Sequence, residues 1–204
     1  SLPNGSQAIG VRGRASYRGD PGYRNDYGLF VNRGLVLDSD HRWTFEGEAR
    51  RREYPSELSE RTYTNAGLSA TWNRAEQDGR ASLGVTVTAG HEWAENNRAD
   101  GDQSFYGMSV DWGRDISESS SVFLFGWYEH NGFHSDRVVV DATDVPARES
   151  SRADDLFEFG GGIVHRFAGG WTLRPEIVYI RDESNKEFAT YSSTEMWVTV
   201  RRTF

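Results

Sequence analysis

Hydrophobic and polar residues alternate along most of this chain. Between Leu83 and Ala89, apolar residues stand at every odd position, with Gly84, Thr86 and Thr88 between them. Successive side chains of a β-strand point to opposite faces of a sheet, so this period of two predicts a strand with one apolar and one polar face. A helical spacing of three to four fits these stretches poorly. The clearest alternating stretches are 9–18, 42–50, 66–73, 82–90, 106–112, 171–179 and 195–201.

Three further segments, 26–37, 121–131 and 155–167, resemble strands but alternate less regularly. Together with the first group they predict ten β-strands. The chain has no run of about 18 apolar residues, the length that a membrane-spanning helix needs. Because a chain of 204 residues suits one domain, we expect residues 1–204 to form a single all-β domain.

The connectors between the expected strands alternate in length. Those at 37–41, 74–80, 113–119 and 168–170 are short, whereas the others are longer and polar, with the longest expected at about 132–154. Outer-membrane barrels have long loops outside the cell and short turns in the periplasm. The pattern therefore predicts an antiparallel up-and-down transmembrane β-barrel in the outer membrane of a Gram-negative bacterium. Both termini are expected on the periplasmic side.

Tryptophan residues gather beside the short connectors, on the apolar face of the expected strands. An indole ring favours the headgroup layer of a membrane, where the ring is buried and its N–H stays hydrated. The alternative is that these residues form the core of a β-sandwich, but their clustering at one end favours a membrane girdle. The expected girdle consists of Trp43, Trp72, Trp112, Trp171 and Phe204.

Composition agrees with a barrel and excludes other classes. Hydrophobic residues make up only 36% of the chain and the mean hydropathy is −0.70, yet aromatic residues reach 13%. In a barrel only every second strand residue faces lipid, so the remaining positions tolerate charge. The net charge of −8 argues against a nucleic-acid-binding protein, which usually carries a basic patch. Cysteine is absent, which excludes disulfide and thiolate chemistry.

The polar face of the expected strands carries charges of both signs. Charges that face a low-dielectric interior must be paired or hydrated. Two interpretations follow: ladders of arginine and carboxylate that fill the barrel, or a hydrated pore whose charged rows select a polar solute. The expected lumen-lining residues are Arg12, Arg14, Arg42, Glu46, Glu48, Arg50, Arg174, Glu176, Glu195 and Arg201.

A catalytic site is not expected. The candidates for a hydrolytic site at the outer rim are His130, His134, Ser135 and Asp136. Adjacent residues of a strand point to opposite faces, so His134 and Ser135 are poorly placed for a catalytic dyad. No spacing typical of metal ligands and no phosphate-binding glycine loop is present, so no cofactor is expected.

The C-terminal residues resemble those of known outer-membrane proteins. The alternating segment 195–204, closed by Phe204, resembles the signal read by the barrel assembly machinery, although Arg202 stands where an apolar or aromatic residue is more usual. Segment 174–204, with Asp182, Ser184 and Asn185 in its connector, resembles the last hairpin of barrels that follow tetratricopeptide repeats. Examples are exopolysaccharide export porins and surface lipoprotein assembly modifiers. The resemblance implies a barrel domain excised from a longer export protein.

These observations lead to a first hypothesis: a conduit for a polar substrate, used to export a secreted polymer such as an exopolysaccharide. The alternatives are a filled structural barrel whose loops bind lipopolysaccharide, a partner or a phage, a porin for small solutes, and a hydrolase at the rim. The expected partners are the lipid bilayer, lipopolysaccharide, the barrel assembly machinery and periplasmic export proteins, with no nucleic acid. Whether ten strands close on themselves or belong to a larger wall stays open.

Overall fold

The computed structural model describes residues 5–16, 24–76, 79–95, 101–141 and 148–203, and these form ten β-strands. The strands are β1 (Gly5–Ser16), β2 (Arg24–Val36), β3 (His41–Glu53), β4 (Tyr63–Ala75), β5 (Ala81–Ala94), β6 (Gln103–Asp115), β7 (Ser120–Asp141), β8 (Arg148–Arg166), β9 (Trp171–Ser184) and β10 (Tyr191–Arg202). Three short 3₁₀ turns join them: η1 (Ser56–Arg61), η2 (Ala168–Gly170) and η3 (Glu187–Ala189). In the described part of the chain, no helix is long and apolar enough to cross a membrane.

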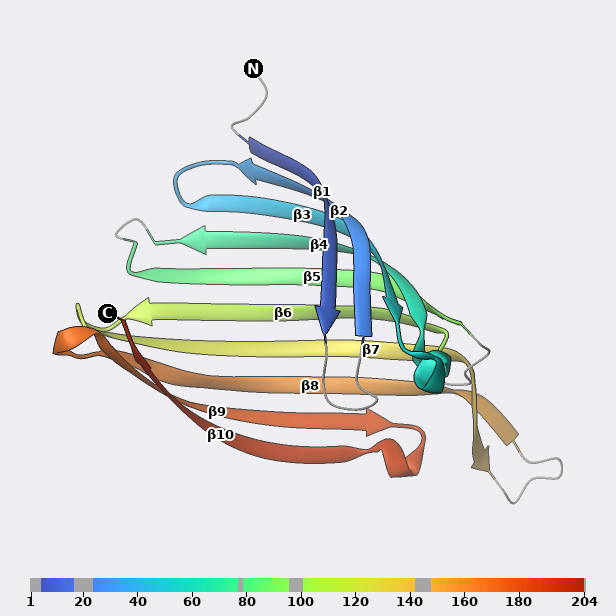
Figure 1. Ribbon diagram of the computed structural model, residues 1–204. Coiled ribbons are helices and arrows are strands. Elements are labelled where there is room, and N and C mark those ends of the chain that lie inside the picture. Colours follow the sequence, from blue (N-terminus) through green and yellow to red (C-terminus); the bar gives the residue numbers. More distant parts are fainter. Residues whose placement is uncertain (1–4, 17–23, 77–78, 96–100, 142–147, 204) are drawn as a thin grey trace.

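The strands form one sheet in which each strand pairs only with its neighbours in sequence. The order is β1 to β10 without a crossover, and every neighbouring pair is antiparallel. The sheet is strongly curved, and β1 and β2 bend away from the direction of β5–β8 (Figure 1). No ladder joins β1 to β10 among the described residues. The prediction of an up-and-down antiparallel sheet with ten strands is therefore confirmed.

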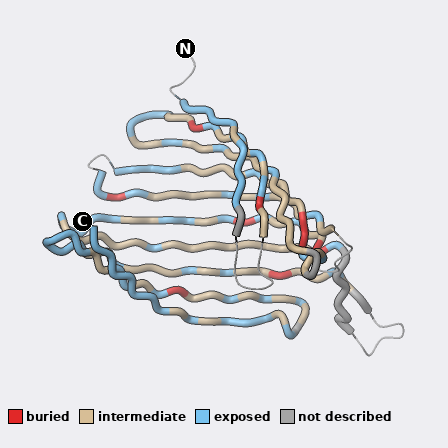
Figure 2. Tube along the Cα trace, in the orientation of Figure 1, coloured by how far each residue is buried: buried red, intermediate tan, exposed pale blue. Residues whose placement is uncertain are grey.

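The two faces of this sheet differ in how far their side chains are covered. In β2 the covered residues alternate with exposed ones from Asp26 to Gly34, and β6 alternates in the same way (Figure 2). Cross-strand pairing carries this alternation from strand to strand, because paired residues lie on the same face. We call the more covered face the inner face and the other the outer face.

The outer face carries most of the large apolar side chains that are exposed. Val11, Leu68 and Met196 are 80%, 72% and 78% exposed, and all three lie on this face. Among the described residues only four apolar side chains are buried: Tyr63, Ala81, Phe133 and Val178. A water-soluble protein hides its apolar surface in a core, and a large exposed apolar face usually marks contact with a membrane or a partner. This distribution of apolar side chains is the one expected of a protein whose outer face contacts an apolar environment.

Short turns connect neighbouring strands at one end of the sheet, as the sequence predicts. In the turn between β2 and β3, the backbone N–H of Leu37 donates to the carbonyl of His41 over 3.0 Å. Equivalent bonds close the turns between β6 and β7, from Ile116 to Ser120, and between β8 and β9, from Phe167 to Trp171. The C-terminal end of β10 also lies here, where Thr203 donates to Gly170.

The expected long loop at 132–154 is largely strand. β7 continues to Asp141 and β8 begins at Arg148, with shifts in their register between Gly132 and Arg137. This stretch of sequence is rich in polar residues and has no regular apolar alternation, so period-two hydrophobicity does not reveal the pairing. A hairpin of paired strands therefore replaces most of the predicted loop.

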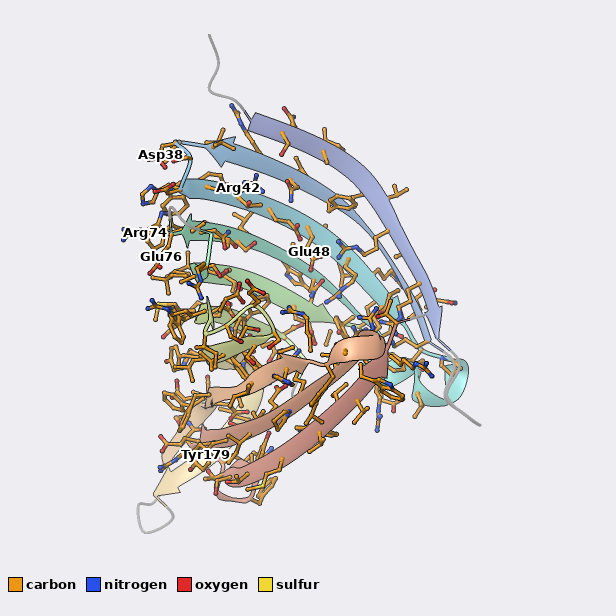
Figure 3. All side chains as sticks on the ribbon, turned by 90° about the vertical axis from the view of Figure 1, so that its left-hand side faces the viewer. Asp38, Arg42, Glu48, Arg74, Glu76 and Tyr179 are labelled. Carbon is orange, nitrogen blue, oxygen red and sulfur yellow. The ribbon has the colours of Figure 1, made fainter. Side chains whose placement is uncertain are left out.

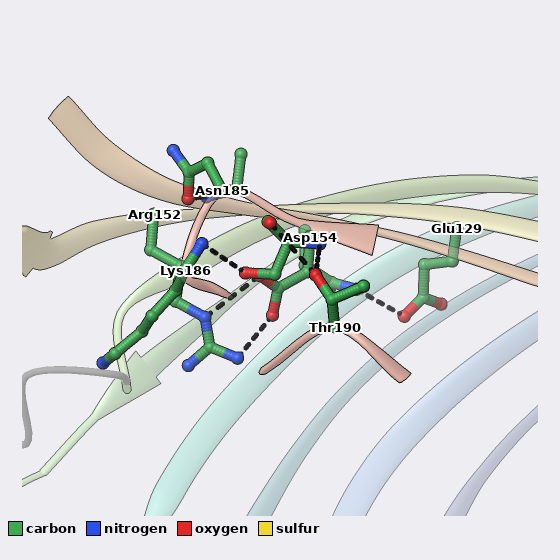
Figure 4. Close-up of polar contacts among 9 residues, drawn as sticks. Glu129, Arg152, Asp154, Asn185, Lys186 and Thr190 are labelled. Carbon is green, nitrogen blue, oxygen red and sulfur yellow. Dashed lines mark hydrogen bonds and ion pairs between the residues drawn. The ribbon is translucent and has the colours of Figure 1, made fainter. Parts of the chain in front are cut away.

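A cluster of polar side chains links β8 and β9 at the strand ends opposite the short turns (Figure 4). Asp154 is buried and accepts hydrogen bonds from the Arg152 guanidinium, at 3.0 and 2.5 Å, and from the Ser184 hydroxyl at 2.5 Å. The amide side chain of Asn185 donates to the Ser151 carbonyl and accepts from the Ala153 backbone N–H. Ser184 and Asn185, which carry part of the sequence resemblance, thus have a structural role in this cluster.

Candidate functional site

All ten charged residues expected to line a lumen lie on the inner face. Pairing aligns Arg12 with Gly28 and Arg50, and the same register continues through the rest of the sheet. Arg42 and Glu48 of β3 can be followed in Figure 3. The ten residues are Arg12, Arg14, Arg42, Glu46, Glu48, Arg50, Arg174, Glu176, Glu195 and Arg201. The function of this face as the lining of a water-filled lumen stays a prediction.

The densest part of this charged face is a recess of about 190 Å³ formed by β1, β2 and β3. It lies at the ends of these strands away from the short turn at 37–40. Because residues two apart on a strand share a face, Arg12 and Arg14 enter it from β1, and Arg50 and Arg52 enter it from β3. The charged residues of this arginine recess are Arg12, Arg14, Arg24, Asp26, Glu48, Arg50 and Arg52.

Ion pairs across the strands hold the recess together. Asp26 is only 9% exposed, and its carboxylate accepts from Arg52 Nε at 2.6 Å and lies 3.2 Å from Arg24 Nε. On the other side, Arg12 Nη1 lies 3.6 Å from Glu48 Oε2, and this pair joins β1 to β3 across Gly28 of β2. These contacts fix the positions of the side chains around the recess.

The arginine recess has more positive than negative charge. Five guanidinium groups face two carboxylates, which leaves an excess of three positive charges. Arg50 Nε is buried and has no hydrogen-bond partner within the described part of the chain. Asn65, the cross-strand neighbour of Arg50 on β4, has a buried Oδ1 that likewise lacks a partner, so the excess of guanidinium groups is the feature that suggests an anion. A guanidinium is well suited to bind carboxylate, phosphate or sulfate oxygens in a bidentate manner. The arrangement is chemically suited to an anion.

The remaining charged residues of the inner face are more dispersed. On β9, Arg174 Nη2 lies 2.9 Å from Glu176 Oε2. Glu195 and Arg201 lie on β10, which is an edge of the sheet. These residues extend the polar surface along the face without forming a second recess of the same density.

The four tryptophans expected in a girdle lie on the outer face, near the short turns. Trp43 pairs directly with Trp72 on the neighbouring strand. Trp72 in turn pairs with Val85 of β5, and Trp112 pairs with Leu83, two residues before Val85. Trp171 begins β9 immediately after the turn η2. Their position at a membrane surface stays a prediction, and Phe204 lies outside the described residues.

Aromatic residues on the inner face are the main feature that the sequence analysis misses. Phe123, Phe125 and Trp127 of β7, and Trp197 of β10, face the same side as the charged rows. In β7 the outer positions are also apolar, as at Leu124, so the segment lacks the contrast that assigns faces from sequence. The arginine recess likewise includes Arg24, Asp26 and Arg52, whose proximity depends on strand register.

The candidate catalytic histidines lie in hydrogen-bonded groups on the outer face. His130 Nδ1 is 2.9 Å from Asp155 Oδ1, and the same carboxylate accepts from the Tyr128 hydroxyl at 2.8 Å. His134 Nε2 lies 3.0 Å from the Ser104 hydroxyl, which also lies 2.9 Å from His91 Nδ1.

The side chains of Ser135 and Asp136 lie outside the described part of the structure. Among the described residues, no group of three or more histidine, aspartate and glutamate side chains is placed to hold a metal ion.

Solved outer-membrane proteins have a similar fold. No protein-family model matches the chain, and no curated protein matches it either. The chain superposes on OmpT of Vibrio cholerae, an outer membrane protein in trimer form, with a TM-score of 0.57 and 13% identity, covering 98% of this chain and 60% of that one. It superposes on the FrpB iron transporter from Neisseria meningitidis with a TM-score of 0.59 and 11% identity, covering 96% and 39%.

These similarities establish the fold of an outer-membrane β-barrel wall. The identities are too low to carry function from either protein to this one. This chain spans less than two thirds of the length of both proteins.

Proposed function

We propose that this protein contributes the wall of a β-barrel in the outer membrane of a Gram-negative bacterium and conducts a polar, negatively charged substrate along its inner face. The observation that carries the proposal is the arginine recess, with three excess positive charges and the buried, unsatisfied Nε of Arg50. Cationic groups along a narrow passage attract anions and raise their local concentration.

The membrane assignment follows from the polarity of the two faces. In hydrocarbon, every backbone hydrogen-bonding group must be satisfied internally. The ladders between neighbouring strands do this within the sheet, and the outward edges of β1 and β10 would pair with each other or with further strands of a larger wall. The outer face offers the exposed apolar side chains that hydrocarbon favours, such as Val11 and Leu68. In this arrangement the short turns and both chain termini face the periplasm. The barrel assembly machinery inserts the protein into the membrane beside lipopolysaccharide.

The specific substrate that we propose is a secreted polymer, such as an acidic exopolysaccharide, delivered by export proteins of the periplasm. A polymer passes many weak sites in succession, and the inner face provides guanidinium groups on β1–β3, β9 and β10. The resemblance of segment 174–204 to the last hairpin of export barrels supports the same assignment.

A filled structural wall is the second candidate, and the ion pairs favour it. Arg52 with Asp26, and Arg12 with Glu48, neutralise one another across strands, as expected of a wall stabilised from inside. Such a wall would present its connectors to lipopolysaccharide, a partner or a phage. The two candidates differ in whether ions cross the protein.

No catalysis is part of this proposal. Ser104 lies between His91 and His134 on the outer face, but no carboxylate among the described residues hydrogen-bonds to either histidine. A serine nucleophile requires a base that is oriented by a third group, and donors for the oxyanion.

Ion selectivity of the full-length protein in planar bilayers tests the conduit. Under a salt gradient we expect a reversal potential that indicates preference for anions, and we expect Arg14→Gln together with Arg50→Gln to reduce that preference. Arg33→Gln is the matched control, because Arg33 lies on the outer face of β2 and leaves the recess intact. Absence of any conductance would reject the conduit and favour the structural wall.

A further inference from the structure

An aromatic strip lies on the inner face, away from the arginine recess. Phe123 and Phe125 of β7 have ring centroids 6.5 Å apart and planes inclined by only 8°. The two rings therefore lie nearly parallel to each other on the inner face. It stands on a face whose other exposed groups are mostly polar.

Glycines of β8 allow these rings to lie against the wall. A Cβ atom added at Gly160 would stand 2.7 Å from Phe125 Cζ, and one added at Gly162 would stand 2.8 Å from Phe123 Cζ. These distances are shorter than real contacts, so any side chain there would displace the rings. The glycine run thus lets the tip of each ring, and the carbonyl oxygens of Ile177 and Pro175 on β9, approach the backbone of β8 closely, which only glycine permits.

An ion pair from β9 adds a charged group to the strip. The guanidinium carbon of Arg174 lies 4.4 Å from the centre of the Phe123 ring, and Arg174 is paired with Glu176. This geometry is a cation–π contact, and it orients the remaining guanidinium donors along the strip.

A polar recess of about 360 Å³ borders the strip on its other side. Its polar lining includes Thr71, Asn73, Thr86 and Asp111, and the hydroxyl oxygens of Thr71 and Thr86 lie 2.9 Å apart. The volume falls within the range of about 300–1,000 Å³ that small-molecule sites occupy. The rings of Phe123 and Phe125 thus line one cavity together with hydroxyl, amide and carboxylate groups.

We propose that this strip and recess bind sugar residues of a saccharide chain, which gives the conduit of the proposed function a defined substrate site. A sugar ring has an apolar face of C–H groups and a rim of hydroxyls. The face of an aromatic ring is partly negative and attracts the C–H groups, while the polar side chains hydrogen-bond to the hydroxyls.

Other ligand classes fit this arrangement less well. A purely apolar ligand would leave Asp111, Asn73 and the threonine hydroxyls without partners, at a cost in free energy. A small inorganic anion would use Arg174 but would gain nothing from two parallel rings. A sugar chain uses the apolar strip, the polar rim and the guanidinium together.

Block of ion current by defined saccharides tests the inference. The full-length protein is reconstituted in planar bilayers, and maltohexaose and hexagalacturonate are added as neutral and acidic probes. We expect both to interrupt the current reversibly, and we expect Phe123→Ala or Phe125→Ala to weaken block by about tenfold. Phe157→Ala and Phe159→Ala are matched controls on the outer face of β8, and they should leave block unchanged.

Conservative variants separate loss of the ring from loss of folding. Phe125→Leu retains apolar volume without a ring face, so we expect it to lose block as Phe125→Ala does while keeping the parent's conductance. Conductance without saccharide block, or block that the leucine variant preserves, would overturn the sugar site and leave the conduit intact. Absence of conductance would reject the conduit, and saccharide affinity in detergent, measured by calorimetry on the same variants, would then decide the site independently.

Discussion

The inner face is built differently in its first three strands and in β7–β9. In the arginine recess, long charged side chains stand up from β1–β3 and pair across strands, as Arg52 does with Asp26. In the aromatic strip, the tips of the Phe123 and Phe125 rings lie over Gly162 and Gly160, where no side chain intervenes. The period-two pattern places both sets on the same face.

This difference suggests a division of roles along the proposed passage. Charged groups act over a distance and attract an anion without defining its shape, because their interaction with it decays slowly. A flat ring acts only at contact and favours a ligand with a matching apolar surface. We infer that β1–β3 govern charge preference and that β7–β9 govern recognition of the sugar.

The largest expected effect tests the assignment of faces on which both regions depend. Val85→Arg places a charge on the outer face and should cost about 2–4 kcal/mol at the middle of a bilayer, enough to block assembly. Thr86→Arg, one residue away on the inner face, should be much milder. Heat-modifiable mobility of the two variants in gels measures folded protein, and equal loss in both would show that the faces are misassigned.

Removal of the buried carboxylate should weaken the arginine recess. Asp26→Asn leaves Arg52 and Arg24 without their charged partner, so we expect a loss of about 1.5–3 kcal/mol in the free energy of unfolding. The same change should increase preference for anions, since one negative charge is removed. Denaturant titration measures the loss of stability, and reversal potentials measure the preference for anions. An unchanged reversal potential would show that the arginine recess does not affect ion conduction.

A methyl group beneath a ring should disturb the aromatic strip by a smaller amount. Gly162→Ala places a Cβ against the Pro175 carbonyl oxygen and 2.8 Å from Phe123 Cζ, so the backbone of β9 and the ring must both shift, and overpacking of this kind costs about 1–3 kcal/mol. Gly13→Ala is the control, because an added Cβ there meets nothing within 4 Å. We expect only the first variant to lower stability in denaturant and to weaken saccharide block.

The smallest expected effect lies in a turn that belongs to neither region. The pKa of Asp38 is lowered because its carboxylate accepts hydrogen bonds from the backbone N–H of Asp40, and then from the His41 ring and backbone. A lowered folded-state pKa stabilises the protein above the ordinary value of 3.8, and this contribution is lost as pH falls through the lowered pKa.

Thermal unfolding midpoints of the parent and Asp38→Asn measure this effect. The parent should be slightly more stable near neutral pH, and the two midpoints should converge as acid protonates Asp38. A constant difference at all pH values would contradict the assignment.

Much of the architecture is predictable from sequence because membrane exposure imposes a regular pattern. Alternation at Leu83–Ala89 identifies a strand and also its two faces, and the ten predicted charged residues all lie on one face. The pattern fails in β7, where Phe123, Leu124 and Phe125 are apolar on both faces. It also fails near Arg137, where a stretch without regular apolar alternation forms a paired hairpin.

The candidate sites are less predictable than the fold because they depend on register between strands. Arg12 and Glu48 meet because the register of β1, β2 and β3 brings them diagonally across β2. Phe123 reaches the backbone of β8 because its partner there is Gly162. Neither relation is contained in the periodicity of a single strand.

Thiol accessibility tests the central claim, that the inner face of the sheet lines a hydrated passage, most directly. The chain has no cysteine, so single cysteines report without a background signal. We measure labelling of Thr86→Cys, Val87→Cys and Thr88→Cys by a charged, membrane-impermeant thiol reagent, with the full-length protein in lipid vesicles. Rapid labelling at 86 and 88 with protection at 87 is predicted, whereas labelling at 87 alone or protection at all three positions would contradict a hydrated inner face.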